Sequence, residues 1–361
     1  MRNVTSHVHR LVALLVVATF ALTACGSEPA VVPVQRVSTK LMDSSPAFGL
    51  KLLDQLLGEP DADNVFISPL SATIMLSMAA SASHGETRAA MLKALGLDAS
   101  SDPSAEAAAT IRRLNQSDAN AQLELAQAVW AQDGLKLSPA YVAKLRDDYN
   151  AQFGNLDFRS PNAPGVVNRW VDGATHHKIS ELVDRFPDHT VGFLVNATYF
   201  HALWAREFKA MSDRDFQTFA GATTRVPMMR RDNNVIVLST PDYQAALLPY
   251  KDARFSALIV LPKQKLAPKD FAAFLTEARW SQAIGYLHQS AGQTFDGKCT
   301  DQGFGDSRVT CDGTLVMPKF TLEYKKDLTG TLAAIGMPMP ASLPEWCIGC
   351  VLSQVIQKTY L

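Results

Sequence analysis

The stretch NVFISPLSATIMLSMAASASHGETRAAMLKALGL, Asn64 to Leu97, decides how the rest of the chain is interpreted. Ser68 followed by Pro69 offers a side-chain oxygen for the first free amides of a helix and a proline suited to its first turn. The residues that follow are almost wholly apolar, so the predicted helix must be buried on most sides. A second helix is expected to end at Gly96, and NVFIS is expected to form a short strand.

Helical patterns fill the first half of the chain and strand patterns most of the second. A helix is expected from Asp43, where capping residues precede apolar side chains that share one face. Further helices are expected from Ser138 and over Ala163–Ile179. From Val191 onward strands dominate, and the last of them, VLSQVIQKTYL at Val351–Leu361, reads as one continuous strand. The predicted fold class is therefore a single-domain α+β protein.

The composition is that of a folded protein with a large core. The chain has 361 residues, of which 47% are hydrophobic and 19% charged, and its net charge is −1. Such a chain is not disordered. Its small net charge gives no reason to expect a nucleic acid or an acidic membrane surface as partner. No cofactor is predicted.

The N-terminus predicts export. The apolar run Leu11–Ala21 is too short to span a bilayer but suits the centre of a secretory signal. It ends in LTAC, Leu22 to Cys25, which resembles a bacterial lipobox. We expect residues 1–24 to be a signal peptide, Cys25 to carry lipid, and residues 25–42 to form a tether. The protein would then be a cell-surface or periplasmic lipoprotein that contacts the membrane only through Cys25; the alternative is a plain signal peptide with a coincidental cysteine.

Four further cysteines are present, and in an exported protein an even set of thiols is expected to form disulfides. Four cysteines allow three pairings, and proximity in the sequence favours Cys299 with Cys311 and Cys347 with Cys350. A zinc site built from all four is the weaker interpretation, because only one close pair has ligand spacing.

Familiar catalytic signatures are missing from the sequence, so no catalytic residue and no metal site is predicted. His176-His177 is a poor bidentate ligand, because neighbouring helical residues point about 100° apart. Trp346-Cys347-Ile348-Gly349-Cys350 resembles the Trp-Cys-x-x-Cys of thiol oxidoreductases, which need the first cysteine at a helix N-terminus. The following residues are strand-like, so a local disulfide is favoured, and a thiol oxidoreductase using Cys347 and Cys350 stays open as an alternative.

Taken with its neighbours, the opening stretch resembles the helix-B region of the serpin family. The resemblance continues in family order through VNRWVDGATHHKISELV, FLVNATYFHALWAREF and LVMPKFTLEYKKDLTGTLAAIGM. It implies a serpin domain over 43–361 with three β-sheets, a large central sheet and a layer of helices. It also implies a protein that is not an enzyme but inhibits serine or cysteine proteases by inserting a cleaved loop into that sheet.

The resemblance also assigns roles to individual residues. Ser68 and Ser71 match the family's shutter beneath the centre of the main sheet, and Asn196 matches the strand that faces them. Gln357 stands where the family has a histidine, and an amide can form hydrogen bonds but cannot titrate. Trp204 and Lys319 match the breach, where insertion begins, although Trp204 suits a plain core equally well.

The largest departure from the family pattern is at the end of the given sequence. At Leu361 the family sequence would continue into the reactive loop and the last core strands. We therefore expect an incomplete serpin domain, truncated before the reactive-centre loop, with the reactive-site bond absent from the chain. The alternative function is that of a non-inhibitory serpin or a binding module.

Overall fold

The structure is a computed structural model, and the residues it describes belong to one compact unit within residues 31–361. The predicted signal peptide, the lipidation site Cys25 and Cys299 lie outside the described part of the chain. The described ranges are 39–59, 64–115, 119–218, 221–251, 254–292 and 301–360.

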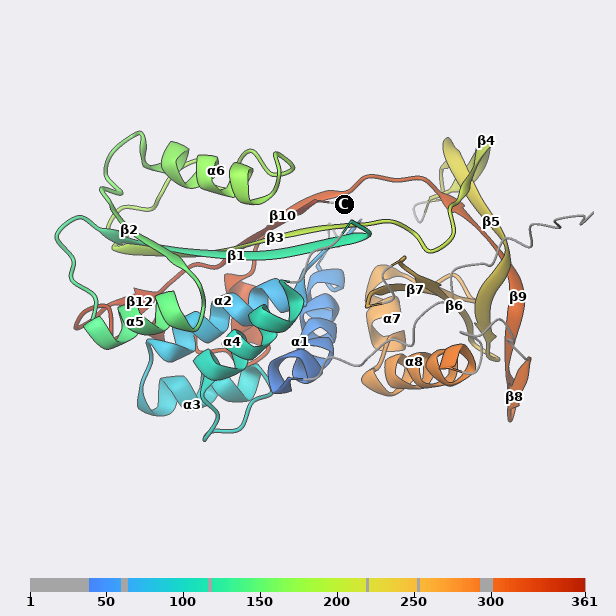
Figure 1. Ribbon diagram of the computed structural model, residues 1–361, viewed down its shortest axis with the longest axis horizontal. Coiled ribbons are helices and arrows are strands. Elements are labelled where there is room, and N and C mark those ends of the chain that lie inside the picture. Colours follow the sequence, from blue (N-terminus) through green and yellow to red (C-terminus); the bar gives the residue numbers. More distant parts are fainter. Residues whose placement is uncertain are drawn as a thin grey trace, which may run out of the picture. The chain divides into compact units, whose positions relative to one another are not determined.

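Four helices precede the first strand (Figure 1), and α2 is central among them. Ile74, Leu76 and Met78 of α2 are fully buried, as its apolar sequence predicts, and the Ser68 side chain caps it by accepting from Ser71 N. Helix α1 begins three residues before the predicted Asp43, because Thr39 caps it and Leu41 is buried in the core. These helices are α1 (Lys40–Leu57), α2 (Pro69–Ser81), α3 (Gly85–Ala94) and α4 (Pro103–Leu114).

The first sheet lies between two helical layers. Its strand order is β2-β1-β3, with β1 and β2 parallel and β1 and β3 antiparallel. Helices α2 and α4 lie against one face, and α6 crosses the other (Figure 1). The bounds are β1 (Ala121–Gln132), α5 (Pro139–Asp147), β2 (Gln152–Leu156), α6 (Ala163–Ala174) and β3 (Gly192–Ala202).

A second, six-stranded sheet is formed by the next part of the chain. Its order is β7-β6-β5-β9-β8, with β4 paired to β5, and α8 packs against β5 and β6. The elements are β4 (Lys209–Gln217), β5 (Thr223–Ser239), β6 (Tyr243–Pro249), β7 (Ser256–Pro262), α7 (Pro268–Phe274), α8 (Glu277–Gly292), β8 (Gln302–Phe304) and β9 (Ser307–Pro318).

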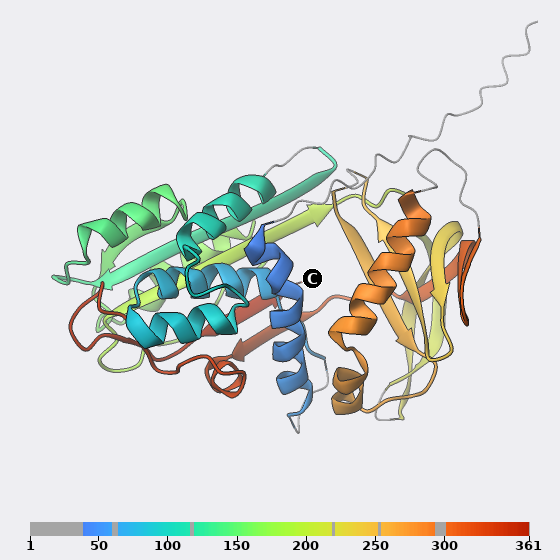
Figure 2. The same cartoon turned by 90° about the horizontal axis from the view of Figure 1, so that it is seen from below.

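The C-terminal part forms two separate strand pairs. Strand β10 (Glu323–Asp327) pairs with β13 (Ile356–Tyr360), and β11 (Ala341–Ser342) pairs with β12 (Val351–Leu352), while α9 covers Thr329–Ala334. In Figure 2 these red strands lie across α2 from the green strands β1 and β3.

Of the strands predicted from the sequence, one is broken in the structure and another is not formed. The final strand is broken between Leu352 and Ile356, because Val355 N donates to Thr329 Oγ1 and Val355 O accepts from Leu328 N at the start of α9. NVFIS is not a strand, since its carbonyl at Phe66 accepts from the Thr359 side chain rather than from a strand backbone. In both places a polar side chain forms the hydrogen bond that the backbone of a neighbouring strand would form in a sheet.

The predicted helix over Ala163–Ile179 ends earlier, at Ala174. Thr175 Oγ1 donates to Val171 O and accepts from Ile179 N, while His176 and His177 adopt positive φ values of 50° and 62°. The two histidines therefore lie on a left-handed turn, and they contact Glu124 and Asp172 separately. In the described part of the chain, no helix combines the length and the apolar character needed to cross a membrane.

Candidate functional site

Strands β3 and β13 border a gap. Strand β3 is paired on one edge with β1 and β13 on one edge with β10, but no ladder joins β3 to β13 among the described residues. A cavity of about 430 Å³ occupies this region, lined by both strands, the start of α2 and the residues that follow α6. Two strand edges that no ladder pairs with each other in the described residues thus border one space, which is the geometry that accepts an added strand.

One side of the gap is tied to α2 through Ser71. The Ser71 hydroxyl is buried, donates to Asn196 Oδ1 and lies 2.7 Å from Thr198 Oγ1. Thr198 Oγ1 also donates to Asn196 Oδ1 at 3.1 Å. The remaining amide group, Asn196 Nδ2, is buried without a hydrogen-bond partner among the described residues. A buried, unpaired donor beside the gap favours a polar occupant such as a peptide carbonyl.

The other side of the gap is tied to the same helix through Gln357. Its amide accepts from Ser68 N at 3.1 Å and donates to Ser68 O at 2.9 Å. The structure therefore brings Ser68, Ser71, Asn196 and Gln357 together around the start of α2. Each strand is bonded to the start of α2, and in the described residues no ladder joins it to the other strand. The strands can therefore part without breaking a bond between them.

A segment that we call the cover, Thr175–Thr190, lies over the gap on the face away from α2. Ile179, Leu182 and Val183 of the cover pack in one apolar cluster with Val195 of β3. Its backbone reaches the opposite strand as well, since the Lys358 ammonium donates to Glu181 O at 2.9 Å. An entering strand must therefore pass beneath the cover.

Charges also join the cover to the C-terminal strand pair. Asp184 lies 3.5 Å from the Lys325 ammonium on β10. A hydrogen bond with Glu181, together with the charges of Lys325 and Lys358, lowers the pKa of the Asp184 carboxyl. The Lys178 ammonium lies 5.6 Å from the centre of the Tyr360 ring. The family resemblance already included the start of this segment, through Val183, but it assigned none of these residues to the site; the polar Asn168 of α6 was a usable signal.

Trp204 and Lys319, the two residues that the resemblance assigns to the breach, contact different parts of the protein. Trp204 stacks on Tyr250 with ring centres 4.3 Å apart and packs against Phe208. Lys319 is exposed, and its backbone amide donates to Pro227 O. Trp204 thus sits in an aromatic group beyond the end of β3, which agrees with a core role as well as with a role in sheet opening.

Cys347 and Cys350 form a disulfide with Cα atoms 5.2 Å apart. It closes the turn between β11 and β12 rather than the first turn of a helix. The helix dipole that lowers the pKa of an oxidoreductase thiol is therefore not present at Cys347. Cys311 is also disulfide-bonded. No cluster of three or more metal-ligating side chains occurs in the described ranges.

Comparison with known protein families shows which family the chain belongs to. A profile of the serpin family, described as serine protease inhibitor, matches residues 43–361. The chain belongs to the serpin family. Its serpin fold is confirmed by cleaved kallistatin complexed with heparin, which superposes with a TM-score of 0.76 at 20% identity and covers 89% of this chain and 93% of that one. Serpins are typically inhibitors without enzymatic activity, which agrees with the expectation that the chain is not an enzyme.

Two silkworm proteins are among the relatives that this chain resembles in sequence. Antitrypsin from Bombyx mori is 31% identical over 65% of this chain and 62% of its own length. Antichymotrypsin-2 from the same species is 31% identical over 64% of this chain and 64% of its own length. The aligned part of this serpin thus spans less than two thirds of each of these relatives.

Proposed function

We propose that this serpin inhibits serine or cysteine proteases by taking an extended peptide segment into the gap between β3 and β13. The open gap is the observation that supports this proposal. A strand placed there would gain two backbone ladders and meet the free Asn196 amide. The free energy released by completing the sheet would drive the trapping of a protease attached to that segment.

In this proposal Ser68, Ser71, Asn196 and Gln357 form the shutter, and Trp204 and Lys319 mark the place where insertion begins. The names of the two silkworm relatives, antitrypsin and antichymotrypsin-2, motivate serine proteases as first targets. In the family the inserted segment is the reactive loop, and its bait residue would set the individual target.

The full-length gene product is the protein to use in testing this proposal. Incubation with trypsin-type, chymotrypsin-type and papain-type proteases should give a covalent complex that survives SDS for at least one of them, because the acyl-enzyme is trapped. The same protease with its nucleophile chemically blocked should give none. Cleavage of the serpin without any such complex would instead support the non-inhibitory alternative, a module that holds a peptide strand.

We further propose that the protein is exported and held at the membrane by lipid on Cys25, and this rests on the sequence from Leu11 to Cys25. Expression in a bacterial host with labelled palmitate should place label on the protein and the protein in the membrane fraction. Cys25→Ser should lose both, whereas Cys311→Ser should keep both. Label that persists in Cys25→Ser would contradict lipidation at this residue.

A further inference from the structure

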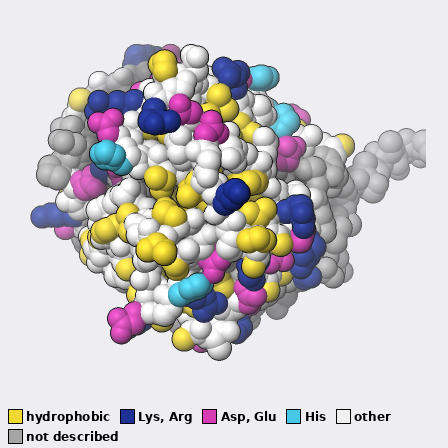
Figure 3. Space-filling model, turned by 90° about the vertical axis from the view of Figure 1, so that its left-hand side faces the viewer, with side chains coloured by type: hydrophobic (Ala, Val, Ile, Leu, Met, Phe, Trp, Pro, Cys, Tyr) yellow, Lys and Arg dark blue, Asp and Glu magenta, His cyan; other side chains and the backbone are white. Residues whose placement is uncertain are grey.

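The turn from Leu343 to Cys350, which we call the disulfide turn, is closed at its base by a hydrogen bond and in its last four residues by a disulfide. Leu343 N donates to Cys350 O at 2.9 Å, and the disulfide joins Cys347 to Cys350. On its outer side Ile348 is fully exposed and Gly349 has a φ of 81°. Figure 3 faces this end of the molecule, where hydrophobic side chains lie among charged ones. The disulfide therefore restrains a turn whose outer residues have few contacts of their own.

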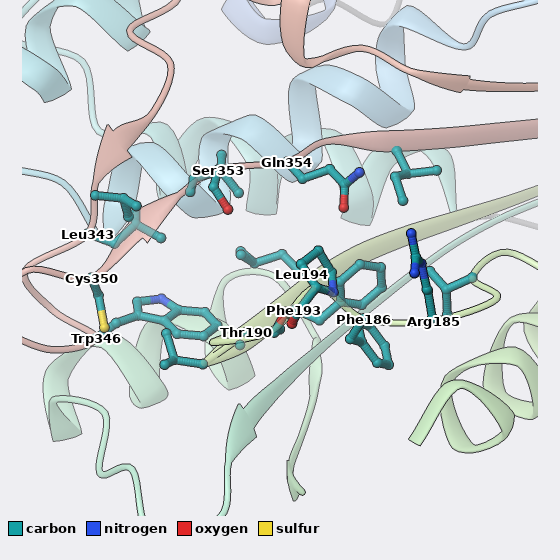
Figure 4. A pocket seen from close by; sticks show the side chains of 17 residues that line it. Arg185, Phe186, Thr190, Phe193, Leu194, Leu343, Trp346, Cys350, Ser353 and Gln354 are labelled. Carbon is teal, nitrogen blue, oxygen red and sulfur yellow. Dashed lines mark hydrogen bonds between the residues drawn. The ribbon is translucent and has the colours of Figure 1, made fainter. Parts of the chain in front are cut away.

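On the inner side of the disulfide turn, the Trp346 ring packs against Gly192, the first residue of β3. Trp346 is 3% exposed, and a Cβ on Gly192 would lie 1.5 Å from Cζ3 of its ring. Figure 4 shows Trp346 and Cys350 beside Thr190 and Phe193, around a cavity of about 60 Å³. The ring therefore lies against the backbone of β3, in space that any other residue at position 192 would fill.

The disulfide turn is also fixed to the helices. Glu345 O accepts from Ser138 N at 3.0 Å, and Glu345 Oε1 lies 2.7 Å from His84 Nε2. Three residues after β12 the chain enters β13, the far border of the gap. Trp346 thus connects the start of β3 to the segment that leads into β13, at one end of the gap.

We propose that the disulfide turn is a redox-controlled clamp: with the Cys347–Cys350 bond intact, Trp346 holds the Gly192 end of the gap closed, and reduction releases it. The inference rests on the proposed function, because it concerns how readily the same gap opens. It predicts that oxidation state sets the rate of strand separation at this end of the sheet and leaves the six-stranded sheet unchanged.

The reductant is an external dithiol, and the two sulfurs differ in access. Cys347 is half-buried, whereas Cys350 is 5% exposed. One thiolate of the reductant bonds to Sγ of Cys347, the protein S–S bond breaks, and its electron pair and a proton go to Sγ of Cys350. The second thiolate of the reductant then closes a cyclic disulfide, and Cys347 leaves and takes a proton. The protein gains two electrons and two protons, and the reductant loses the same number.

Amide hydrogen exchange of the full chain tests the clamp without using any protease. We expect reduction with dithiothreitol to speed exchange of residues 192–195 and 351–357 by about tenfold, because these amides would exchange through a local opening that the clamp restrains. Exchange in β5 and β6 should not change. The variant Cys299→Ser/Cys311→Ser, which keeps only the disulfide turn among the downstream cysteines, should respond to reduction like the wild type.

Trp346→Leu distinguishes a clamp from a merely structural disulfide. With the bond intact, this variant should already exchange fast over residues 192–195, and reduction should add less than about twofold, because the two changes act through one contact. Equal exchange of residues 192–195 in oxidised and reduced wild-type protein would overturn the clamp, and so would a full additional effect of reduction in Trp346→Leu. Neither result depends on whether the serpin inhibits a protease.

Discussion

Gly192→Ala is expected to lower the free energy of unfolding by about 3 kcal/mol, near the upper end for adding a methyl group to a packed core. A Cβ at this position would lie 1.5 Å from Cζ3 and 2.4 Å from Cη2 of the Trp346 ring. The disulfide turn and its bonds to Ser138 and His84 leave the buried ring little freedom to move away. Urea unfolding followed by tryptophan fluorescence measures the change.

A matched control is Gly285→Ala on α8. Gly285 is exposed in a helix and an added Cβ would meet nothing within 4 Å. This change should therefore stabilise the protein by about 0.5–1 kcal/mol through helix propensity. The double variant Gly192→Ala/Trp346→Leu should recover part of the loss, because the smaller side chain makes room for the methyl group. Similar stabilities of Gly192→Ala and Gly285→Ala would show that the ring does not lie against residue 192.

The sequence predicted those parts of the fold that local chemistry determines. Ser68-Pro69 placed the start of α2 correctly, and the apolar run after it predicted the burial that the structure shows. The family resemblance then pointed to Asn196 and Gln357, whose amides are both within hydrogen-bond reach of the segment Ser68–Ser71. These features were predictable because each depends on a short motif and one partner strand.

Features that depend on two distant segments were not predictable in this way. The division of the final strand follows from Thr329 and Leu328, which lie more than twenty residues before the Val355 that they bind. The contact of Trp346 with Gly192 joins residues far apart in the sequence, and neither residue alone suggests it. A strand-like pattern says that backbone groups need partners, but not whether a neighbouring strand or a polar side chain supplies them.

The second large effect is expected from Asn168→Ala, which removes the side chain that fastens the cover to α6. Asn168 Oδ1 accepts from Leu182 N at 2.9 Å and from Val183 N at 3.0 Å, and its Nδ2 donates to Val183 O at 2.8 Å. Leu182 and Val183 are both less than 5% exposed, so their backbone groups would lose partners where water has little access. Each such group costs about 1–3 kcal/mol, and partial relaxation of the cover should leave a net loss of about 3 kcal/mol.

Arg169→Ala changes the exposed neighbour of Asn168 and should alter the free energy of unfolding by less than about 0.5 kcal/mol. In Asn168→Ala, hydrogen exchange should accelerate over residues 179–183 and remain slow in β6, because the cover lies on the first sheet and not on the six-stranded one. Asn168→Asp keeps an acceptor for the two amides but turns a second oxygen toward Val183 O in place of the amide donor, so it should also lose stability. If Asn168→Ala were as stable as Arg169→Ala, the cover would be held by its apolar contacts with Val195 and Ile356 rather than by these three hydrogen bonds.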